Sequence, residues 1–400
     1  MKVLVADKFP ADRLEELRAA GCDVVVNPDL NGPTLTAAVA ETGAEVLVVR
    51  STEVKAETLA VGRLGLVVRA GAGYNTIDTK KASELGIYVS NCPGKNSIAV
   101  AELTMGLVLA LDRQIPDAVA DLRAGVWNKG RYGKARGLYG RTLAILGTGN
   151  VGREVVRRGH AFGLHVRAWS RSLTPEAAAE MGLTFCATPV EAVTSADIVS
   201  IHLALKPETR GLVGQAVFDA LKPGAYLINT ARAEIVDECA LLAAVKAKGI
   251  RAAVDVFVGE PAQTSGSVAS ALFKEPGVIG THHIGASTDQ AQDAIAQETV
   301  RIVVEYKTTG KVPNCVNVAA RTPATHLLVV RHRDRVGVLA HVFAHLKDAG
   351  INVQETDNTV FDGAMAATAH IQVDQVPKAS LLAEIRKGSE DILEIAVKAI

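Results

Sequence analysis

The chain has 400 residues, of which 48% are hydrophobic and 22% charged, a composition typical of an ordinary globular protein with two or three domains. Its 43 basic and 43 acidic residues cancel, so the net charge gives no indication of nucleic acid or an anionic membrane as a partner. The wide spacing of the cysteines argues against a metal cluster and a disulfide framework. These cysteines are Cys22, Cys92, Cys186, Cys239 and Cys315.

The most lipid-like segment, 103–111, is interrupted by Thr104 and is far shorter than the roughly 20 residues that a membrane-spanning helix needs. The first ten residues, MKVLVADKFP, carry charge within the first apolar run and show no cleavage signal, so they do not predict a signal peptide. We therefore expect a soluble protein of the reducing cytoplasm.

The N-terminal region alternates short apolar runs with helical patterns. Residues 3–6 form the first run and end at a carboxylate, Asp7, and a helix-period stretch at 11–20 is then stopped by Gly21. Further apolar runs follow at 24–26, 45–49 and 66–68. Because parallel strands need crossover connections, this alternation predicts a parallel sheet.

A second α/β region begins after two helical patterns, at 98–111 and 116–124, which suit a crossover between domains. It contains six predicted strands, at 142–146, 165–169, 198–202, 225–229, 252–256 and 278–280. A helix at 289–307 follows, and the turn-rich segment 308–314 reads as a linker.

From residue 325 the order becomes β-α-β-β-α-β. The predicted strands are 326–331, 352–360, 365–373 and 392–397, and the predicted helices are 338–349 and 378–386. Asp362-Gly363 predicts a tight two-residue hairpin turn, since such a turn needs positive φ. The predicted fold is therefore α/β, with two Rossmann-like or flavodoxin-like parallel-sheet domains and a C-terminal ferredoxin-like α+β domain.

A glycine-rich turn, Gly147-Thr148-Gly149-Asn150-Val151-Gly152, lies between a predicted strand and a predicted helix. The first glycine permits the tight turn, the second lets the backbone approach a pyrophosphate, and the third lets helix and strand pack closely. Because both flanks fit, we interpret the turn as a dinucleotide site.

The next predicted strand lacks the acid that usually holds the ribose 2′-hydroxyl of NAD. Ser170 stands in its place and Arg171 follows, with no carboxylate before Glu176. A cation here could neutralise a 2′-phosphate, or it could be a solvated loop residue. NAD is the expected cofactor, and NADP stays open.

Three segments in order carry a resemblance: Asn229–Arg232, Asp255–Pro261 and Thr281–Ser287. Together with the glycine turn, Arg69–Gly73 and Ala101-Glu102, they resemble the D-isomer-specific 2-hydroxyacid dehydrogenases. The resemblance implies a substrate-binding domain from residues 1–96 and 286–316 and a dinucleotide-binding domain at 97–285. It also implies a homodimer or homotetramer.

By this resemblance, His283 is the base that takes the hydroxyl proton of a 2-hydroxy acid, and Glu260 orients it. Arg232 would form a forked contact with the substrate carboxylate. The family usually has proline before the histidine, whereas this chain has His282. We prefer His283 because Ile284-Gly285 follows it, as in the family, and we expect His282 to point away because neighbouring strand residues face opposite sides. Beyond the glycine turn and the segment 170–171, the implied cofactor-binding residues are Thr230, Ala231, Asp255, Ile284, Gly285 and Ala286.

The resemblance also implies a phosphorylated substrate, D-3-phosphoglycerate, whose phosphate would lie on Arg50 and Arg69. The implied substrate-binding residues are Arg50, Ser51, Arg69, Ala70 and Gly71, the turn at 70–73 offering backbone N–H groups. Solvated strand-end arginines are the plainer alternative. Relatives that reduce hydroxypyruvate or glyoxylate or oxidise D-lactate, and non-catalytic nucleotide sensors, are the alternative functions.

Residues 325–400 resemble an ACT domain, a regulatory fold that often binds amino acids. The segment His332–Leu339 matches its strand-to-helix turn, except that Val336 replaces the usual proline. By position, His332, Asp334 and Asn352 are the candidates for binding an effector, L-serine. A purely oligomerising role is the alternative.

Overall fold

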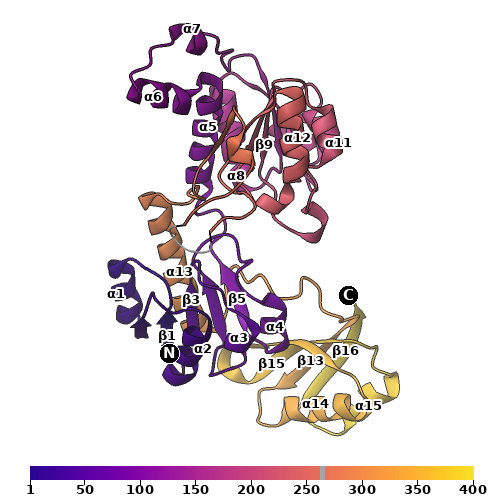
Figure 1. The fold of residues 1–400 in the computed structure, drawn as a ribbon. Coiled ribbons are helices and arrows are strands. Elements are labelled where there is room, and N and C mark those ends of the chain that lie inside the picture. Colours follow the sequence, from indigo (N-terminus) through magenta and orange to yellow (C-terminus); the bar gives the residue numbers. More distant parts are fainter. Residues whose placement is uncertain (262–265) are drawn as a thin grey trace. The chain divides into compact units, whose positions relative to one another are not determined.

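The computed structural model describes residues 1–261 and 266–400 and divides them into two compact units, Met1–Asn317 and Val318–Ile400. The first unit contains two parallel sheets, and the second contains one antiparallel sheet (Figure 1). The predicted fold class is confirmed.

The first sheet has the strand order β2-β1-β3-β4-β5. Its strands are β1 (Lys2–Val5), β2 (Asp23–Val26), β3 (Val46–Val49), β4 (Leu66–Arg69) and β5 (Tyr88–Asn91). The helices that pack against them are α1 (Ala11–Ala19), α2 (Gly32–Thr42), α3 (Ala56–Leu59), α4 (Thr79–Glu84) and α13 (Asp289–Thr309). The apolar runs are continuous because helices cover both faces, with Leu17 and Ile302 in one core cluster and Leu35 and Val39 in another. The strand order reverses between β1 and β3.

The second sheet has the order β12-β11-β10-β9-β6-β7-β8 and reverses between β6 and β9. Its strands are β6 (Thr142–Leu146), β7 (His165–Trp169), β8 (Thr184–Phe185), β9 (Ile198–Ile201), β10 (Tyr226–Asn229), β11 (Arg251–Val254) and β12 (Val278–Gly280). In open α/β sheets, ligands bind beyond the carboxyl ends of the strands at such a reversal.

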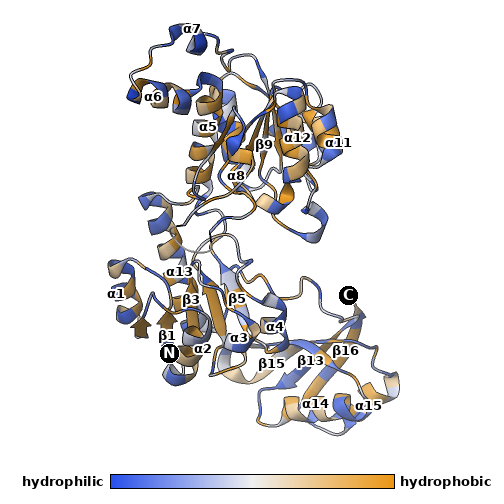
Figure 2. Cartoon of the chain, viewed as in Figure 1, coloured by the Kyte–Doolittle hydropathy of each residue, from blue (hydrophilic) through white to orange (hydrophobic). Residues whose placement is uncertain are grey.

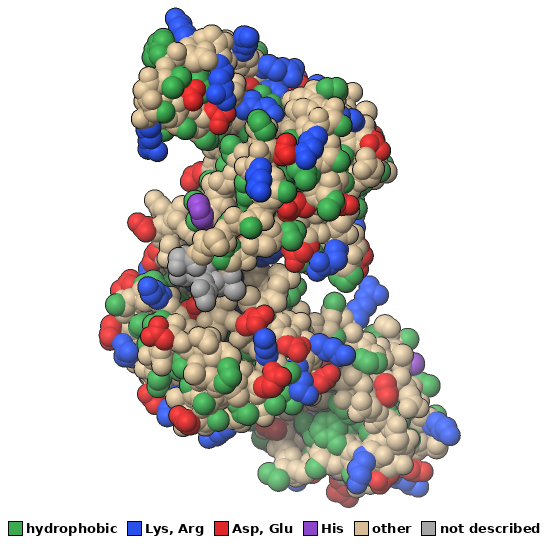
Figure 3. All heavy atoms as spheres, viewed as in Figure 1, with side chains coloured by type: hydrophobic (Ala, Val, Ile, Leu, Met, Phe, Trp, Pro, Cys, Tyr) green, Lys and Arg blue, Asp and Glu red, His purple; other side chains and the backbone are tan. Residues whose placement is uncertain are grey.

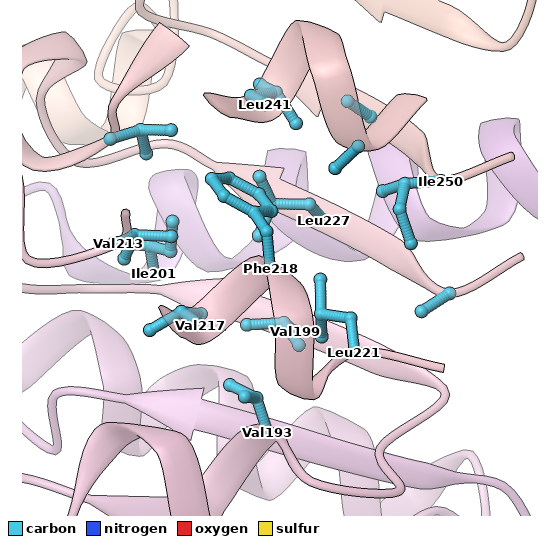
Figure 4. Packing of buried hydrophobic residues seen from close by; sticks show 14 of the residues in the cluster. Val193, Val199, Ile201, Val213, Val217, Phe218, Leu221, Leu227, Leu241 and Ile250 are labelled. Atoms are coloured by element: carbon cyan, nitrogen blue, oxygen red, sulfur yellow. The ribbon is translucent and has the colours of Figure 1, made fainter. Parts of the chain in front are cut away.

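Helices cover both faces of the second sheet. They are α5 (Ser97–Arg113), α8 (Asn150–Ala161) and α9 (Pro175–Glu180) on one face, and α10 (Pro189–Val193), α11 (Gln215–Ala220) and α12 (Glu238–Lys248) on the other. Figure 1 shows α5 and α12 on opposite sides of β9. Phe218 of α11 is almost fully buried among Leu227, Leu241 and Val199 (Figure 4). Two further helices, α6 (Ile115–Arg123) and α7 (Lys129–Tyr132), follow α5.

The smaller unit has the strand order β14-β15-β13-β16, which is that of a ferredoxin-like domain. Its elements are β13 (His326–Arg333), α14 (Val338–Asp348), β14 (Val353–Val360), β15 (Ala366–Val373), α15 (Ala379–Lys387) and β16 (Ile392–Ala399). Single turns of 3-10 helix occur at Pro207–Thr209, Ala233–Ile235, Leu272–Lys274 and Asp362–Ala364.

Two local predictions are wrong. The β14–β15 hairpin closes at the bond from Phe361 N–H to Ala366 O, so the turn has four residues rather than two. Gly363 and Ala364 both take positive φ there, and a 3-10 turn replaces the tight turn.

The predicted linker at 308–314 is also misplaced. Helix α13 continues to Thr309, and Cys315 then forms a β-bridge with Ser90 of the first sheet. Asn317 fastens this return, because its side chain accepts from Val89 N–H at 2.8 Å and donates to the Ile87 carbonyl at 2.9 Å. The connection between the two units therefore begins after Asn317.

Within the described ranges, we find no helix with the length and apolarity to cross a bilayer. Hydropathic colouring places the apolar residues in the strands, for example β3 and β9 (Figure 2). Basic and acidic side chains are interspersed on the face seen in Figure 3, in accord with the zero net charge.

Candidate active site

The glycine turn after β6 has the shape that a dinucleotide needs. Gly147 has φ 104°, and a Cβ there would lie 2.5 Å from the carbonyl oxygen of His202. A Cβ on Gly152 would overlap the Gly147 carbonyl oxygen, whereas one on Gly149 would meet no atom within 4 Å. The first and third glycines are thus required by packing and the second borders open space, so these residues fit a bound pyrophosphate. Asn150 and Val151 begin the helix α8 behind the turn.

Ser170 and Arg171 follow β7 directly. Ser170 is half-buried and accepts a backbone hydrogen bond from Leu173, while Arg171 is exposed. The ion pairs of the described residues do not include Arg171, and no acid stands at this strand end.

Arg232 lies just beyond β10, in a turn shaped by Asn229. The Asn229 side chain accepts from Ala231 N–H at 3.0 Å and donates to the Arg232 carbonyl at 3.0 Å. The guanidinium donates to the Ala231 carbonyl at 2.6 Å and lies where a Cβ on Gly73 would fall. Thr230 is buried, with its hydroxyl 3.0 Å from that of Thr104 in α5. The turn thus places Arg232 against the glycine loop that follows β4. Sequence reasoning assigned no role to Asn229.

His283 and Glu260 form the predicted pair. His283 Nδ1 lies 2.8 Å from Glu260 Oε2, and Glu260 Oε1 accepts from Phe257 N–H at 2.9 Å. Burial of the Glu260 carboxyl favours its neutral form, but the hydrogen bonds from His283 and Phe257 and the charge of Arg232 outweigh this, so its pKa is lowered. An ionised Glu260 accepts a hydrogen bond from Nδ1–H of His283, which leaves Nε2 as the free proton acceptor.

Asp255 anchors the loop that carries His283. Its carboxylate, 1% exposed, accepts from the Thr281 hydroxyl at 2.6 Å and from the N–H groups of Ile284 and Gly285, each at 2.9 Å. A Cβ on Gly285 would lie 3.0 Å from the carboxylate, so glycine permits this close approach. The Asp255 carboxylate and the N–H groups of Ile284 and Gly285, which we predicted to be at the cofactor site, are hydrogen-bonded to one another in this structure, and their binding of a cofactor stays a prediction. Ala286, the last of that set, is half-buried beside them.

The expectation that strand alternation turns His282 away is wrong, although the geometry favours the same residue, His283. Strand β12 ends at Gly280, so the two histidines lie in a loop and the alternation of strand side chains does not apply. His283 has φ 53°, in the left-handed region, and this turn directs its ring to Glu260. His282 is exposed and takes part in none of the side-chain hydrogen bonds found in the described residues.

Arg50 and Arg69 end β3 and β4 at neighbouring places on the first sheet. Arg50 Nη1 lies 3.2 Å from Gln292 Oε1 of α13, and Arg69 Nε is buried without a hydrogen-bond partner in the structure. Burial and the positive charges of Arg232 and Arg50 lower the pKa of Arg69 to about 10. Burial also lowers the pKa of Arg232. The charges of Arg50 and Arg232 thus act on Arg69. Glu234 and Glu260 oppose the effect of burial on the pKa of Arg232.

No ion pair within the described ranges involves Arg50, Arg69 or Arg232. Carboxylates instead pair with other arginines, among them Arg13, Arg141, Arg158 and Arg301. Three arginines that form no ion pair in the part of the chain described suit an anionic ligand, because a buried charge is costly until it is paired. The acids nearby, Glu234 and Glu260, favour the charged form of Arg232 without forming an ion pair with it in the described structure.

The other predicted substrate contacts are only partly arranged as expected. Ala70 N–H donates to the Val49 carbonyl and Gly71 N–H to that of Arg69, each at 2.7 Å, so neither is free for a ligand. Gly71 has φ 152°, and a Cβ there would overlap the Arg69 guanidinium. Its role is to make room for Arg69. The N–H groups of residues 72–73 are the ones left for a carboxylate among the hydrogen bonds described.

The comparisons with known proteins agree with this geometry. Residues 105–285 match the D-isomer specific 2-hydroxyacid dehydrogenase, NAD binding domain. The D-3-phosphoglycerate dehydrogenase of Rattus norvegicus is 33% identical over 98% of this chain and 73% of its own length. The chain belongs to the D-isomer-specific 2-hydroxyacid dehydrogenase family.

Other members of the family are also similar to it. The D-3-phosphoglycerate dehydrogenase of Methanocaldococcus jannaschii is 38% identical over 80% of this chain, which spans 60% of that protein's length. The NAD+-bound structure of 3-phosphoglycerate dehydrogenase from Entamoeba histolytica has a TM-score of 0.66 and 26% identity, covering 80% of this chain and 99% of that one. The chain described here therefore carries an NAD-binding domain, and its glycine turn at 147–152 lies within that domain.

The candidate effector residues of the C-terminal unit, His332, Asp334 and Asn352, do not all lie close together within one copy of that unit. Strands β13 and β14 lie on either side of β15, and both are antiparallel to it. Asn352, just before β14, is therefore level with the start of β13, whereas His332 is near the end of β13. The separation is about 20 Å, at roughly 3.3 Å per strand residue. The separation arises because the crossover helix α14 returns the chain to the end of the sheet where β13 starts.

His332 is also engaged within the unit. It is 2% exposed, and its ring nitrogens lie 2.8 Å from the Arg333 carbonyl and 3.1 Å from Asn358 Oδ1. Asp334 and Asn352 are exposed. A site that used all three side chains would need two copies of this unit.

Proposed function

We propose that the chain is an NAD-dependent dehydrogenase that oxidises D-3-phosphoglycerate to 3-phosphohydroxypyruvate, the first step of serine biosynthesis. The observation that carries the proposal is that Arg50, Arg69 and Arg232 form no ion pair in the described structure, and that Arg69 Nε is buried without a hydrogen-bond partner. A substrate with a phosphate at one end and a carboxylate at the other offers the two anions that this cluster suits.

The two ends of the substrate would bind different arginines. Arg50 and Arg69, at adjacent strand ends of the first sheet, would hold the phosphate through forked hydrogen bonds. Arg232, against the loop at 72–73, would hold the carboxylate. This division leaves the hydroxyl-bearing C2 of the substrate for His283.

His283 would act as the base. With Nδ1 committed to Glu260, Nε2 is free to accept the hydroxyl proton, and ionised Glu260 stabilises the imidazolium that results. The glycine turn and the segment after β7 would hold the dinucleotide, whose nicotinamide accepts a hydride from C2 when bound. Asp255 keeps the base in place through the loop on both sides of it.

The test is the rate of NADH oxidation with 3-phosphohydroxypyruvate, compared with hydroxypyruvate under matched conditions. We expect kcat/KM to favour the phosphorylated substrate by at least about 100-fold, since two charge-assisted arginine contacts are each worth about 1.5–3 kcal/mol. Equal values would support the second candidate, a reductase of unphosphorylated 2-oxo acids such as hydroxypyruvate or glyoxylate, or a D-lactate dehydrogenase.

The cofactor preference between NAD and NADP is part of the proposal. Family membership and the NAD-bound relative favour NAD, whereas exposed Arg171 and the missing acid favour acceptance of a 2′-phosphate. Replacing Arg171 by Ala should leave kcat/KM for NADH almost unchanged and lower it for NADPH if the guanidinium binds that phosphate.

A second copy of the chain is the partner we propose, through the segment that holds α6 and α7. Trp127 is 78% exposed and Leu122 is 59% exposed there, beside a cavity of about 370 Å³. Large apolar side chains gathered in this way mark association surfaces. We propose a homodimer or homotetramer located in the cytoplasm, where the free cysteines would stay reduced.

Binding of L-serine to the C-terminal unit is the regulatory part of the proposal. The separation of Asn352 from His332 makes any such site dependent on two paired copies of this unit. Isothermal titration of the whole chain with L-serine tests it, and the absence of both heat and inhibition would remove it.

A further inference from the structure

Asp7 lies where the strand order of the first sheet reverses. It follows β1 by two residues, and Arg50 follows β3, the parallel neighbour of β1 on one side of the reversal. Ligand sites form at this position of an open α/β sheet, yet an acid is the wrong charge to bind an anion there. The proposed activity gives Asp7 no role.

The Asp7 carboxylate is used to hold the backbone of the loop after β3. Oδ2 accepts from the N–H groups of Arg50, Ser51 and Thr52 at 2.6, 3.2 and 3.2 Å, and Oδ1 accepts from the Ser51 hydroxyl at 3.1 Å. The Thr52 hydroxyl adds a bond to the Ala6 carbonyl at 3.2 Å. Consecutive N–H groups that converge on one carboxylate fix the local φ and ψ angles of the loop. The predicted substrate residue Ser51 is therefore part of this anchor.

The Asp7 carboxylate binds the main chain of Arg50 and forms no ion pair with its guanidinium in the described structure. Asp7 takes part in none of the ion pairs of the described residues, although it is bonded to the main chain of Arg50. The Arg50 side chain instead reaches Gln292, a neutral acceptor, at 3.2 Å. The guanidinium thus stays without a counter-ion while its backbone is held at the sheet edge.

We propose that Asp7 is a positioning residue for the phosphate of the substrate: it fixes the 50–52 loop so that the Arg50 guanidinium faces the same site as Arg69. This inference rests on the proposed function and extends it to a residue that does not touch the substrate. Asp7 thereby contributes to affinity for the phosphorylated end, and not to proton or hydride transfer.

The test compares Asp7→Ala and Asp7→Asn with a matched control, Asp78→Ala, in the full chain. Asp78 also caps backbone, accepting from Lys81 N–H at 2.9 Å at the start of α4. Both Ala variants should lose some thermal stability. Only Asp7→Ala should raise KM for 3-phosphohydroxypyruvate, by about tenfold, with kcat changed less than twofold and KM for hydroxypyruvate little altered. Asp7→Asn, which keeps one acceptor oxygen, should fall between Asp7→Ala and the wild type.

The direction of the KM change in Asp7→Ala distinguishes a positioning role of Asp7 from a purely electrostatic one. If Asp7 acted only through its negative charge near the arginines, its removal would strengthen anion binding and lower KM. A lowered or unchanged KM in Asp7→Ala, in a wild type that prefers the phosphorylated substrate, overturns the inference alone. A wild type without that preference overturns the proposed function, and the inference with it.

Discussion

Two arginines of the second sheet differ in their partners. Arg141, just before β6 at the amino ends of the strands, is 8% exposed; Nη1 lies 3.1 Å from Asp112 and Nε lies 3.6 Å from Asp197. Its guanidinium also stacks over Tyr226 at 4.5 Å. Arg232, beyond β10 at the carboxyl ends, is half-buried and forms no ion pair among the described residues, although Glu234 and Glu260 favour its charged form. A paired buried arginine serves the fold, and an unpaired one is available to a ligand.

The adjacent histidines His282 and His283 differ in the same way, one without a side-chain hydrogen-bond partner among the described residues and one bonded to Glu260, and replacing them should give the largest expected difference in kcat. Replacing His283 by Asn should lower kcat by about 10³-fold, because the proton acceptor is lost. Replacing exposed His282 by Asn should change kcat less than threefold. Steady-state rates of both variants with NADH and 3-phosphohydroxypyruvate measure this. Comparable losses in the two would refute the assignment of His283 as the base.

Arg232 should matter for turnover and not for stability. Arg232→Leu should lower kcat/KM by about 100-fold, because a forked contact with the substrate carboxylate is lost. The free energy of unfolding of Arg232→Leu should stay the same or rise, because the substitution removes a half-buried charge that forms no ion pair in the described structure. Urea denaturation and initial rates provide the two measurements, and a large loss of stability would contradict the comparison.

Arg141 should show the reverse behaviour. Arg141→Leu leaves Asp112 and Asp197 without their buried partner and should lower the free energy of unfolding by about 3–5 kcal/mol. kcat/KM per folded molecule should be nearly unchanged at 25 °C. A variant that folds stably yet loses turnover would show that paired arginines also take part in the reaction.

The ion pair of Glu298 with Arg301 can be tested through the pH dependence of stability. Hydrogen bonds from Arg301, together with Asn314 and Lys95, outweigh its burial and lower its pKa to about 2. Since the folded pKa lies below the unfolded value, this stabilisation is complete above about pH 4.5 and is lost as pH falls toward 2. The difference in unfolding free energy between wild type and Glu298→Gln should be on the order of 3 kcal/mol at pH 7 and should vanish near pH 2. A difference independent of pH would point to packing instead.

The sequence was informative where one residue pattern determines one structure. Apolar runs placed nearly all strands of the parallel sheets, but β5 escaped notice because Tyr88-Val89-Ser90-Asn91 contains a single aliphatic residue. The two-residue strand β8 is too short to show a period. Motif order paired Glu260 with His283, which lie 2.8 Å apart in the structure, and their shared site with Arg232 stays a prediction.

The errors concern relations that only the folded backbone defines. Asp7 and Asp255 are both strand-end acids, and nothing in their local sequence says that each will accept N–H groups from a loop 30 or more residues away. Asn352 follows His332 by 20 residues, but a crossover helix puts it at the opposite end of the sheet. Loop hydrogen bonding and strand direction had to be observed.

Helix α13 implies an order of events during synthesis. Its residues Ile295, Ile302 and Val303 complete the core on one face of a sheet whose last strand ends at Asn91. The ribosome must therefore add about 200 residues, roughly 10–40 s of translation, before that face can be covered. Until then α1 alone covers part of that face, through Leu14 and Leu17, so the nascent N-terminal sheet exposes apolar surface that favours aggregation while the second sheet is being made.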